Sequence, residues 1–122
     1  MVSGERPSGR RCREAGELAD EHLIVGDVAV LIDEIAHATK QDPLALRRKL
    51  LAGSPKHLAV LNAAAGKAGW GTPAPKGVYR GLAQTMGFGS YVAACAEVSV
   101  SDEGVLKIHR IVAATDPGHA VN

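Results

Sequence analysis

Two alternating stretches near the end of the chain, separated by a short polar segment, constrain the fold most. From Val92 to Val100 every second residue is apolar, while Cys95, Glu97 and Ser99 stand between the apolar positions. An apolar period of two is typical of a half-buried strand. After Ser-Asp-Glu-Gly the second stretch alternates in the same way, with Leu106, Ile108 and Val112 separated by Lys107, His109 and Ile111. The pattern predicts two antiparallel strands joined by a tight turn.

The part of the chain before this hairpin contains residues that typically begin and end helices. Asp27, Asp42 and Ser54 are residue types that cap helix N-termini, and prolines directly follow the last two. Gly69 is a C-terminal stop signal. We therefore expect two or three helices over about residues 27–68. The first of them should present an apolar stripe made of Val28, Leu31, Ile32, Ile35 and Thr39.

A short first strand is expected at 78–85, where Gly81 suggests a bulge or a close backbone approach. With strands over about 78–113, the expected fold class is α+β: helices followed by a small, mainly antiparallel sheet. A sheet of this size needs another layer over its apolar face. We interpret residues 1–25 as an irregular or disordered tail. Its arginine cluster is expected to be solvated, and a contact with an anion or nucleic acid is the less favoured interpretation.

Composition excludes several function classes. Lys and Arg number 14 against 13 Asp and Glu, and aromatic residues are 3% of the chain, so neither a basic field nor a stacking platform for nucleic acid is expected. No apolar run reaches the roughly 18 residues of a membrane span. The start of the chain lacks the apolar core of a secretory signal. We expect a cytoplasmic protein, with the periplasm as the open alternative.

Residue chemistry alone assigns neither a catalytic residue nor a metal ligand. The five histidines include no pair spaced four apart, as a helical zinc site would need. Ser90 does not stand in the Gly-x-Ser-x-Gly pattern of a nucleophile elbow. Glu97 would act as a base only if its neighbours raised its pKa. Cys95, on a predicted strand, is expected to be a buried, reduced thiol.

Several segments, taken together and in order, resemble one enzyme family. They are Asp33 to Ala38, Asp42 to Arg48, Ala68 to Pro73, Gly87 to Val100 and Ile108 to Asn122. Over about residues 32–122 the chain resembles the molybdopterin-binding subunit of the xanthine dehydrogenase and aldehyde oxidase superfamily, of the isoquinoline 1-oxidoreductase beta-subunit type. Pro117 departs from the small or thiol residue that the family pattern has at that place.

The resemblance implies a molybdenum-cofactor oxidoreductase that hydroxylates or oxidises heteroaromatic or aldehyde substrates. In such enzymes a glutamate in a Gly-x-Gly-Glu segment is the base, and electrons leave through a 2Fe-2S partner subunit. Neither that segment nor the Gln-containing cofactor loops are in this sequence. We therefore expect a fragment that is inactive and binds no molybdopterin by itself, and whose partners are the iron–sulfur subunit and the remainder of the molybdopterin-binding subunit. The cofactor contacts that the resemblance implies are Gly87, Gly89, Ser90, Asp116 and Gly118.

Simpler interpretations of these same residues stay open. Gly87-Phe88-Gly89 has no third glycine for a dinucleotide fingerprint, and it also suits a strand entry with unusual dihedral angles. Asp116-Pro117-Gly118 is ordinary turn chemistry. The alternative function is a small helix-plus-hairpin interaction module that pairs its exposed hairpin edge with another protein, without catalysis.

Overall fold

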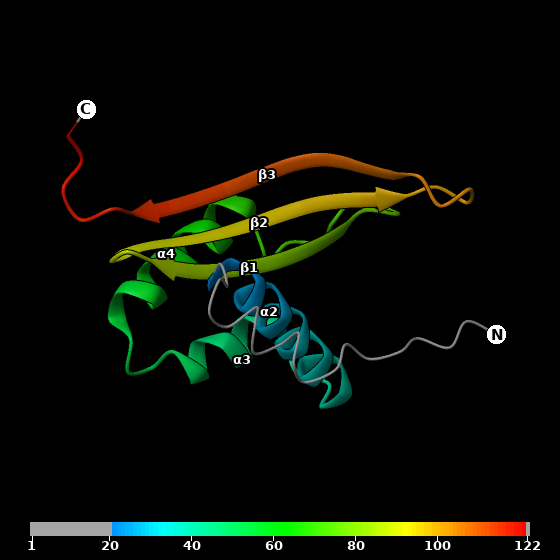
Figure 1. Ribbon diagram of the computed structural model, residues 1–122. Helices are drawn as coiled ribbons and strands as arrows, with labels where there is room; N and C mark the ends of the chain where they lie inside the picture. Colours follow the sequence, from blue (N-terminus) through cyan, green and yellow to red (C-terminus); the bar gives the residue numbers. More distant parts are fainter. Residues whose placement is uncertain (1–20, 122) are drawn as a thin grey trace, which may run out of the picture.

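The computed structural model describes residues 21–121, with side chains described from residue 29 onward. Three helices come first: α2 (Glu21–Ala38), α3 (Pro43–Leu50) and α4 (Pro55–Ala68). Three strands follow: β1 (Tyr79–Gly87), β2 (Ser90–Val100) and β3 (Leu106–Asp116). The strands form one antiparallel sheet in the order β1-β2-β3 (Figure 1). The predicted α+β class is confirmed.

The helix boundaries follow local chemistry at two of the three predicted starts. Asp42 caps α3 by accepting a hydrogen bond from the Ala45 amide at 2.9 Å, and Pro43 stands in its first turn. Ser54 precedes Pro55 at the start of α4, although its hydroxyl makes no capping bond. Gly69 ends α4 in the left-handed region, with φ 71°.

The first helix differs from its prediction in two ways. It begins at Glu21, so Asp27 lies inside the helix and not at its cap, and residues 21–25 are helical where we expected a tail. The rest of that predicted tail, residues 1–20, lies outside the described residues. The stripe prediction was also wrong, because Leu31 and Ile35 are exposed while Ala36 is fully buried. A small side chain at Ala36 allows close packing at this point of the helix.

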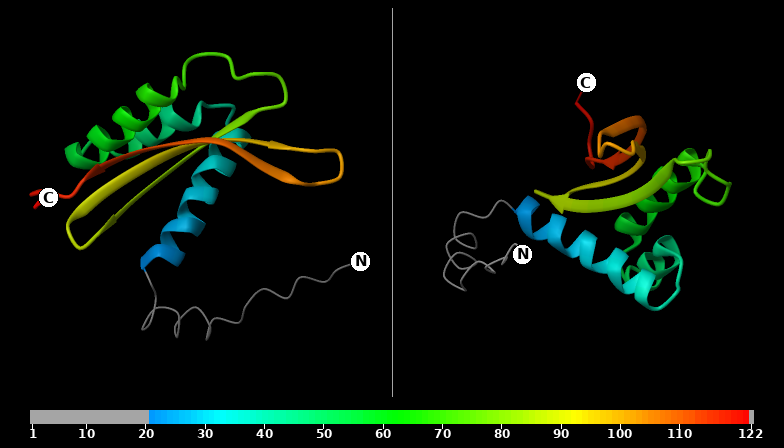
Figure 2. Two further views of the ribbon diagram at one scale, coloured as in Figure 1. Left: turned by 90° about the horizontal axis from the view of Figure 1, so that it is seen from above. Right: turned by 90° about the vertical axis from the view of Figure 1, so that its right-hand side faces the viewer.

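The sheet has one face covered by helices. Its central buried residues are Leu82, Ala93 and Cys95, which pack with Leu61 and the alanines of α4. Helix α4 lies against β2 and β3, while α2 contacts β1 and α3. Figure 2 shows the sheet edge-on, with α4 on one side of it. By register and alternation, this covered face consists of Arg80, Leu82, Gln84 and Met86 on β1, Tyr91, Ala93, Cys95 and Glu97 on β2, and Arg110, Val112, Ala114 and Asp116 on β3.

The opposite face, which we call the open face, carries the apolar series that revealed the strands in the sequence. Its members are Tyr79, Gly81, Ala83 and Thr85 on β1, Val92, Ala94, Ala96, Val98 and Val100 on β2, and Leu106, Ile108, Ile111, Ala113 and Thr115 on β3. The predicted strands are thus confirmed, but the positions buried against the helices are the alternate ones.

Two register details differ from the sequence prediction. The β2–β3 pairing shifts between Glu97 and Val98, whose partners are Arg110 and Ile108. This bulge at His109 puts Ile111 on the same face as Ile108, and it breaks the alternation that the sequence suggested. Gly81, by contrast, pairs with Ala96 in regular register, so the bulge predicted there is absent from the β1–β2 ladder.

Candidate functional site

The five residues for which the resemblance implies cofactor contact come together at one end of the sheet. Gly87 ends β1 and Ser90 begins β2, and the two-residue turn between them consists of Phe88 and Gly89, with φ 51° and 79°. Both positive angles suit a type I′ hairpin turn, so the unusual dihedral angles expected at this corner are confirmed. Because Tyr91 pairs with Asp116, the end of β3 lies beside this turn (Figure 1).

The chemistry at this end is that of turns. The Asp116 carboxylate accepts a hydrogen bond from the Gly118 amide at 3.0 Å, which uses the donor that an anion would need. Pro117 has no amide hydrogen to offer. The space beside Gly87, Gly89 and Gly118 is open. One carboxylate and an engaged amide do not suit the phosphate of a pterin cofactor, so these five residues do not fit that group by themselves.

A hollow of about 310 Å³ lies beside the same end, between the start of α4 and β2. The rings of His57 and Tyr91 meet edge to face with centroids 4.7 Å apart. The Lys56 ammonium lies 5.6 Å from the centre of the Tyr91 ring, at cation–π distance. These contacts fix the first turn of α4 on β2 and hold Lys56 beside the Tyr91 ring.

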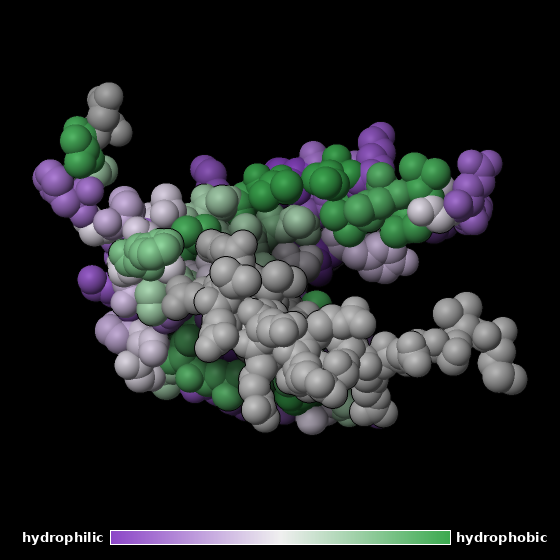
Figure 3. All heavy atoms as spheres, in the orientation of Figure 1, coloured by the Kyte–Doolittle hydropathy of each residue, from purple (hydrophilic) through white to green (hydrophobic). Residues whose placement is uncertain are grey.

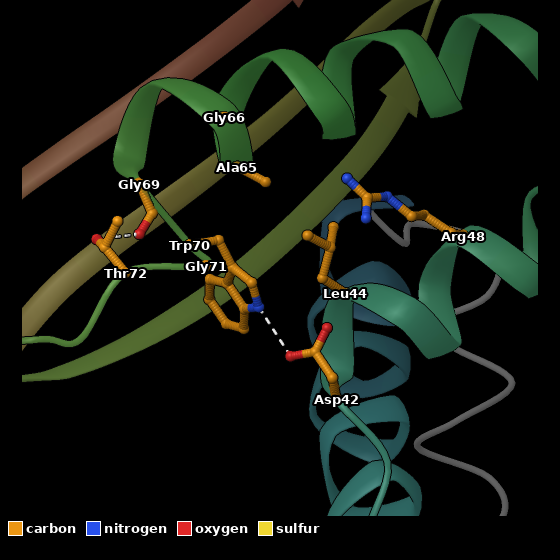
Figure 4. Close-up of a pocket in the computed structure, with 9 residues that line it drawn as sticks. All are labelled: Asp42, Leu44, Arg48, Ala65, Gly66, Gly69, Trp70, Gly71 and Thr72. Atoms are coloured by element: carbon orange, nitrogen blue, oxygen red, sulfur yellow. Dashed lines mark hydrogen bonds between the residues drawn. The ribbon is translucent and has the colours of Figure 1, made fainter.

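A larger pocket, of about 450 Å³, lies between the start of α3 and the end of α4 (Figure 4). The Trp70 indole N–H donates to Asp42 Oδ1 at 2.8 Å, while Asp42 Oδ2 caps α3. Arg48 reaches across to Asn62 on α4, with 2.7 Å between Nε and Oδ1. Trp70 packs against the hydrophobic core just after the end of α4. The polar groups of this pocket therefore join two helices.

Three charged side chains on the covered face link the sheet to the end of α4. Glu97 accepts hydrogen bonds from Arg80 at 2.9 Å and from both Nε and Nη2 of Arg110 at 3.1 and 3.0 Å. The two arginines also donate to the carbonyls of Ala68 and Gly69, at the C-terminus of α4. The hydrogen bonds from Arg110 and then Arg80 lower the pKa of Glu97. A carboxylate held ionised in this way is a structural anion and a poor general base.

Cys95 lies in the centre of the covered face and is a free thiol, as predicted. Burial raises its pKa, and the neighbouring Arg80 opposes this only in part. A thiol with a raised pKa and no exposed surface is unreactive. Cys95 therefore acts as a packing residue.

Arg47 is buried, although it stands in a run of three cations, residues 47–49, in the last turn of α3. Its side chain is 1% exposed and donates to Asp33 at 2.6 Å. It also donates to the carbonyls of Ala29 at 3.1 Å and Leu82 at 3.0 Å. One buried guanidinium thus joins α2, α3 and β1. Its neighbours Arg48 and Lys49 are exposed, as expected for cations at a helix C-terminus.

The open face leaves large apolar side chains exposed within the described part of the chain. Val100, Leu106, Ile108 and Ile111 are between 54% and 59% exposed, and the register makes them neighbours on β2 and β3. Figure 3 shows hydrophobic side chains gathered over the free end of this hairpin. Monomeric proteins rarely leave a contiguous apolar surface of this kind uncovered.

Comparison with protein-family models, with curated proteins and with solved structures finds no match to this chain. Among the described helices, none combines the length and the apolar character that crossing a bilayer requires. Within residues 21–121, no three His, Cys, Asp or Glu side chains gather as a metal site would require.

Proposed function

We propose that this chain is a structural segment of a larger molybdopterin-dependent oxidoreductase, which hydroxylates or oxidises heteroaromatic or aldehyde substrates. The segment supplies a sheet with a helix layer and does not supply a complete active site. The motifs over residues 32–122 support the enzyme class, since they follow the family's order. Their helix-then-strand arrangement agrees with the fold of the chain.

The open face is the observation that carries the proposal. A sheet that buries one apolar face under helices and exposes a second apolar face is one layer short of a stable architecture. The missing layer must be apolar. Residues 1–20 do not have that composition, since charged, glycine and serine residues make up most of them. We infer that another polypeptide segment supplies this cover, as suits a chain that functions within a larger protein.

The resemblance, and no contact within the fold, would put the turn end of the sheet near the cofactor in the complete enzyme. Its five turn residues do not fit a pterin phosphate alone, so any such contact needs groups from the rest of the enzyme. In the complete protein, the molybdenum cofactor would supply the oxidation chemistry. This chain would contribute a sheet with its helix layer, held together by Arg47 and by the hydrogen bonds of Arg80 and Arg110 to Glu97.

The test is co-production of this chain with the polypeptide encoded next to it and with a 2Fe-2S subunit, in cells that make the cofactor. The proposal predicts a stable complex with molybdenum in proportion to the chain, and no molybdenum in the chain purified alone. A matched pair of variants reports the contact: Ile108→Asp on the open face should abolish the complex, whereas Lys107→Asp on the other side of β3 should not. Stoichiometric molybdenum in the isolated chain would contradict the proposal.

The alternative, an interaction module without catalysis, rests on the unpaired edge of β3. If the chain forms a stable complex with another protein through the edge of β3, yet neither molybdenum nor an iron–sulfur protein is present, this second function is favoured.

A further inference from the structure

The two edges of the sheet are protected to different extents. At the β1 edge, the Leu82 carbonyl accepts a hydrogen bond from Arg47, and α2 contacts the strand. β3 is the last strand on the other side, and within the described residues no strand pairs with its outer edge. Seen from above in the left view of Figure 2, no helix crosses over β3. An uncovered edge of this kind is a template for another strand.

Two local features limit the part of β3 that can accept a partner. The bulge at His109 interrupts the regular strand on one side. Pro117, which has no amide hydrogen, ends it on the other. The regular segment between them runs from Arg110 to Asp116, and Ala113 is its midpoint.

This segment is complementary to itself. When two copies pair antiparallel about a two-fold axis at Ala113, Arg110 of one copy lies opposite Asp116 of the other. Ile111 then lies opposite Thr115 in the same way. Each pair consists of residues from the same face of the sheet, so both copies keep their helices on one side.

The charges of the covered face favour this pairing. Glu97 is the one carboxylate that contacts both Arg80 and Arg110, so the described cluster has two positive charges and one negative. Arg110 is 47% exposed, and its Nη1 has no hydrogen-bond partner among the described residues. Asp116 uses Oδ1 for the Gly118 amide. In the paired arrangement its carboxylate lies next to the excess positive charge.

We propose that a second copy of this chain pairs with the free edge of β3, antiparallel and about a two-fold axis at Ala113. The product is one continuous sheet with all helices on one side and both open faces side by side on the other. This inference does not rest on the proposed function, since it requires neither molybdenum nor another protein. Stable interfaces bury about 1,200–2,000 Å² and one short strand pair gives less, so we expect association in the micromolar range.

Sedimentation of the full chain over a wide concentration range tests the charge pairing. Asp116→Asn keeps the acceptor for the Gly118 amide but removes the charge. It should raise the dimer dissociation constant about 2- to 30-fold, because two symmetric cross-strand pairs are lost. Asp102→Asn, in the β2–β3 turn, is the matched control and should leave the constant unchanged. Added salt should weaken the wild-type dimer more than the Asp116→Asn dimer.

Oxidative cross-linking tests the two-fold axis directly. In a background with Cys12→Ser, Ala113→Cys places two thiols opposite each other, within reach of a disulfide between copies. Ala83→Cys, at a position that is also exposed on the open face but lies on β1, is the control. We expect covalent dimers from Ala113→Cys and none from Ala83→Cys. A chain that stays monomeric overturns the proposal. So does a dimer that Asp116→Asn leaves intact and Ile108→Lys abolishes, because that dimer forms through the open face.

Discussion

The covered face and the open face of the sheet are built from the same three strands, yet the larger apolar side chains lie on the open one. Ala93 and Cys95 occupy the centre of the covered face, whereas Ile108 and Ile111 stand exposed on the other. Helix α4 presents mostly alanines to the sheet at its buried positions. Small residues on both sides bring helix and strands close together, so the interior of this protein is dense without being rich in large side chains.

The covered face also contains more of the charged groups. Arg80, Glu97 and Arg110 all lie on it, and each is satisfied by a partner on a neighbouring element. The open face from Val92 to Val100 is purely apolar by comparison. Hydropathy alone would therefore place the core on the wrong side of the sheet. In this protein, paired charges and small residues lie in the interior, while a continuous apolar series lies on the face that is free to form an interface.

The largest effect should come from Arg47, which joins the helices to the covered side of β1. Arg47→Ala leaves the Leu82 carbonyl and Asp33 without their donor, and it should lower the free energy of unfolding by about 3–5 kcal/mol. Arg48→Ala, next along the helix and exposed, should cost less than about 1 kcal/mol. Urea unfolding of both variants measures the difference. Equal losses of unfolding free energy in the two variants would show that Arg47 does not hold α2, α3 and β1 together.

Truncation on the two faces should differ by a smaller margin. Leu82→Ala removes a buried side chain of the covered face and should cost about 2–4 kcal/mol. Ile111→Ala on the open face should cost less than about 1 kcal/mol, since the isoleucine is already largely in water. The measurement is the midpoint of chemical unfolding at low protein concentration, where the chain is monomeric. Similar costs would mean that the open face is covered within a single chain.

The pH dependence of stability tests the Glu97 cluster. Because Arg110 and Arg80 lower the pKa of Glu97 in the folded state, its contribution is complete above the unfolded value of about 4.5 and disappears as the pH falls through the lower folded value. The stability difference between the wild type and Glu97→Gln should thus be constant near neutral pH and shrink in acid. Glu103→Gln, in the exposed turn, is the control. A difference that grows in acid would reverse the assigned sign.

The smallest effect should come from the β1–β2 turn, which belongs to neither face. Phe88 is fully exposed at φ 51°, a region that asparagine tolerates better. Phe88→Asn creates the Asn-Gly pair favoured in type I′ turns and should raise the free energy of unfolding by about 0.5–1 kcal/mol. Thermal unfolding measures it. A loss of stability would imply that the Phe88 ring has a contact that the fold does not show.

Local chemistry made part of the candidate site predictable. The turn residues Gly87, Gly89 and Ser90 stood out because glycines punctuate strands, and Asp116 with Gly118 stood out as a turn. Their meeting at one end of the sheet follows from the Tyr91–Asp116 pairing, which no local pattern specifies. Their role as cofactor contacts stays a prediction.

The missed residues were missed for a physical reason. Arg47 looks like its exposed neighbours in the sequence, and only the approach of α2 and β1 gives it three acceptors. The Glu97 cluster needs two strand registers and the end of α4 in one place. A signal for it existed, because Arg80 and Glu97 are the single charged residues of β1 and β2, but their partners are set by pairing across the sheet.

By itself the sequence determined most of the elements: Asp42, two prolines and Gly69 marked the limits of α3 and α4, and an apolar period of two marked the strands, because these signals act within a few residues of backbone. The start of α2 was not determined in this way. Tertiary structure alone decided which face of the sheet became the core. That choice depends on how closely α4 approaches β2 and β3, on a one-residue bulge that shifts the phase of β3, and on whether buried charges find partners. These are long-range packing terms, and they outweigh the hydrophobicity of any single strand.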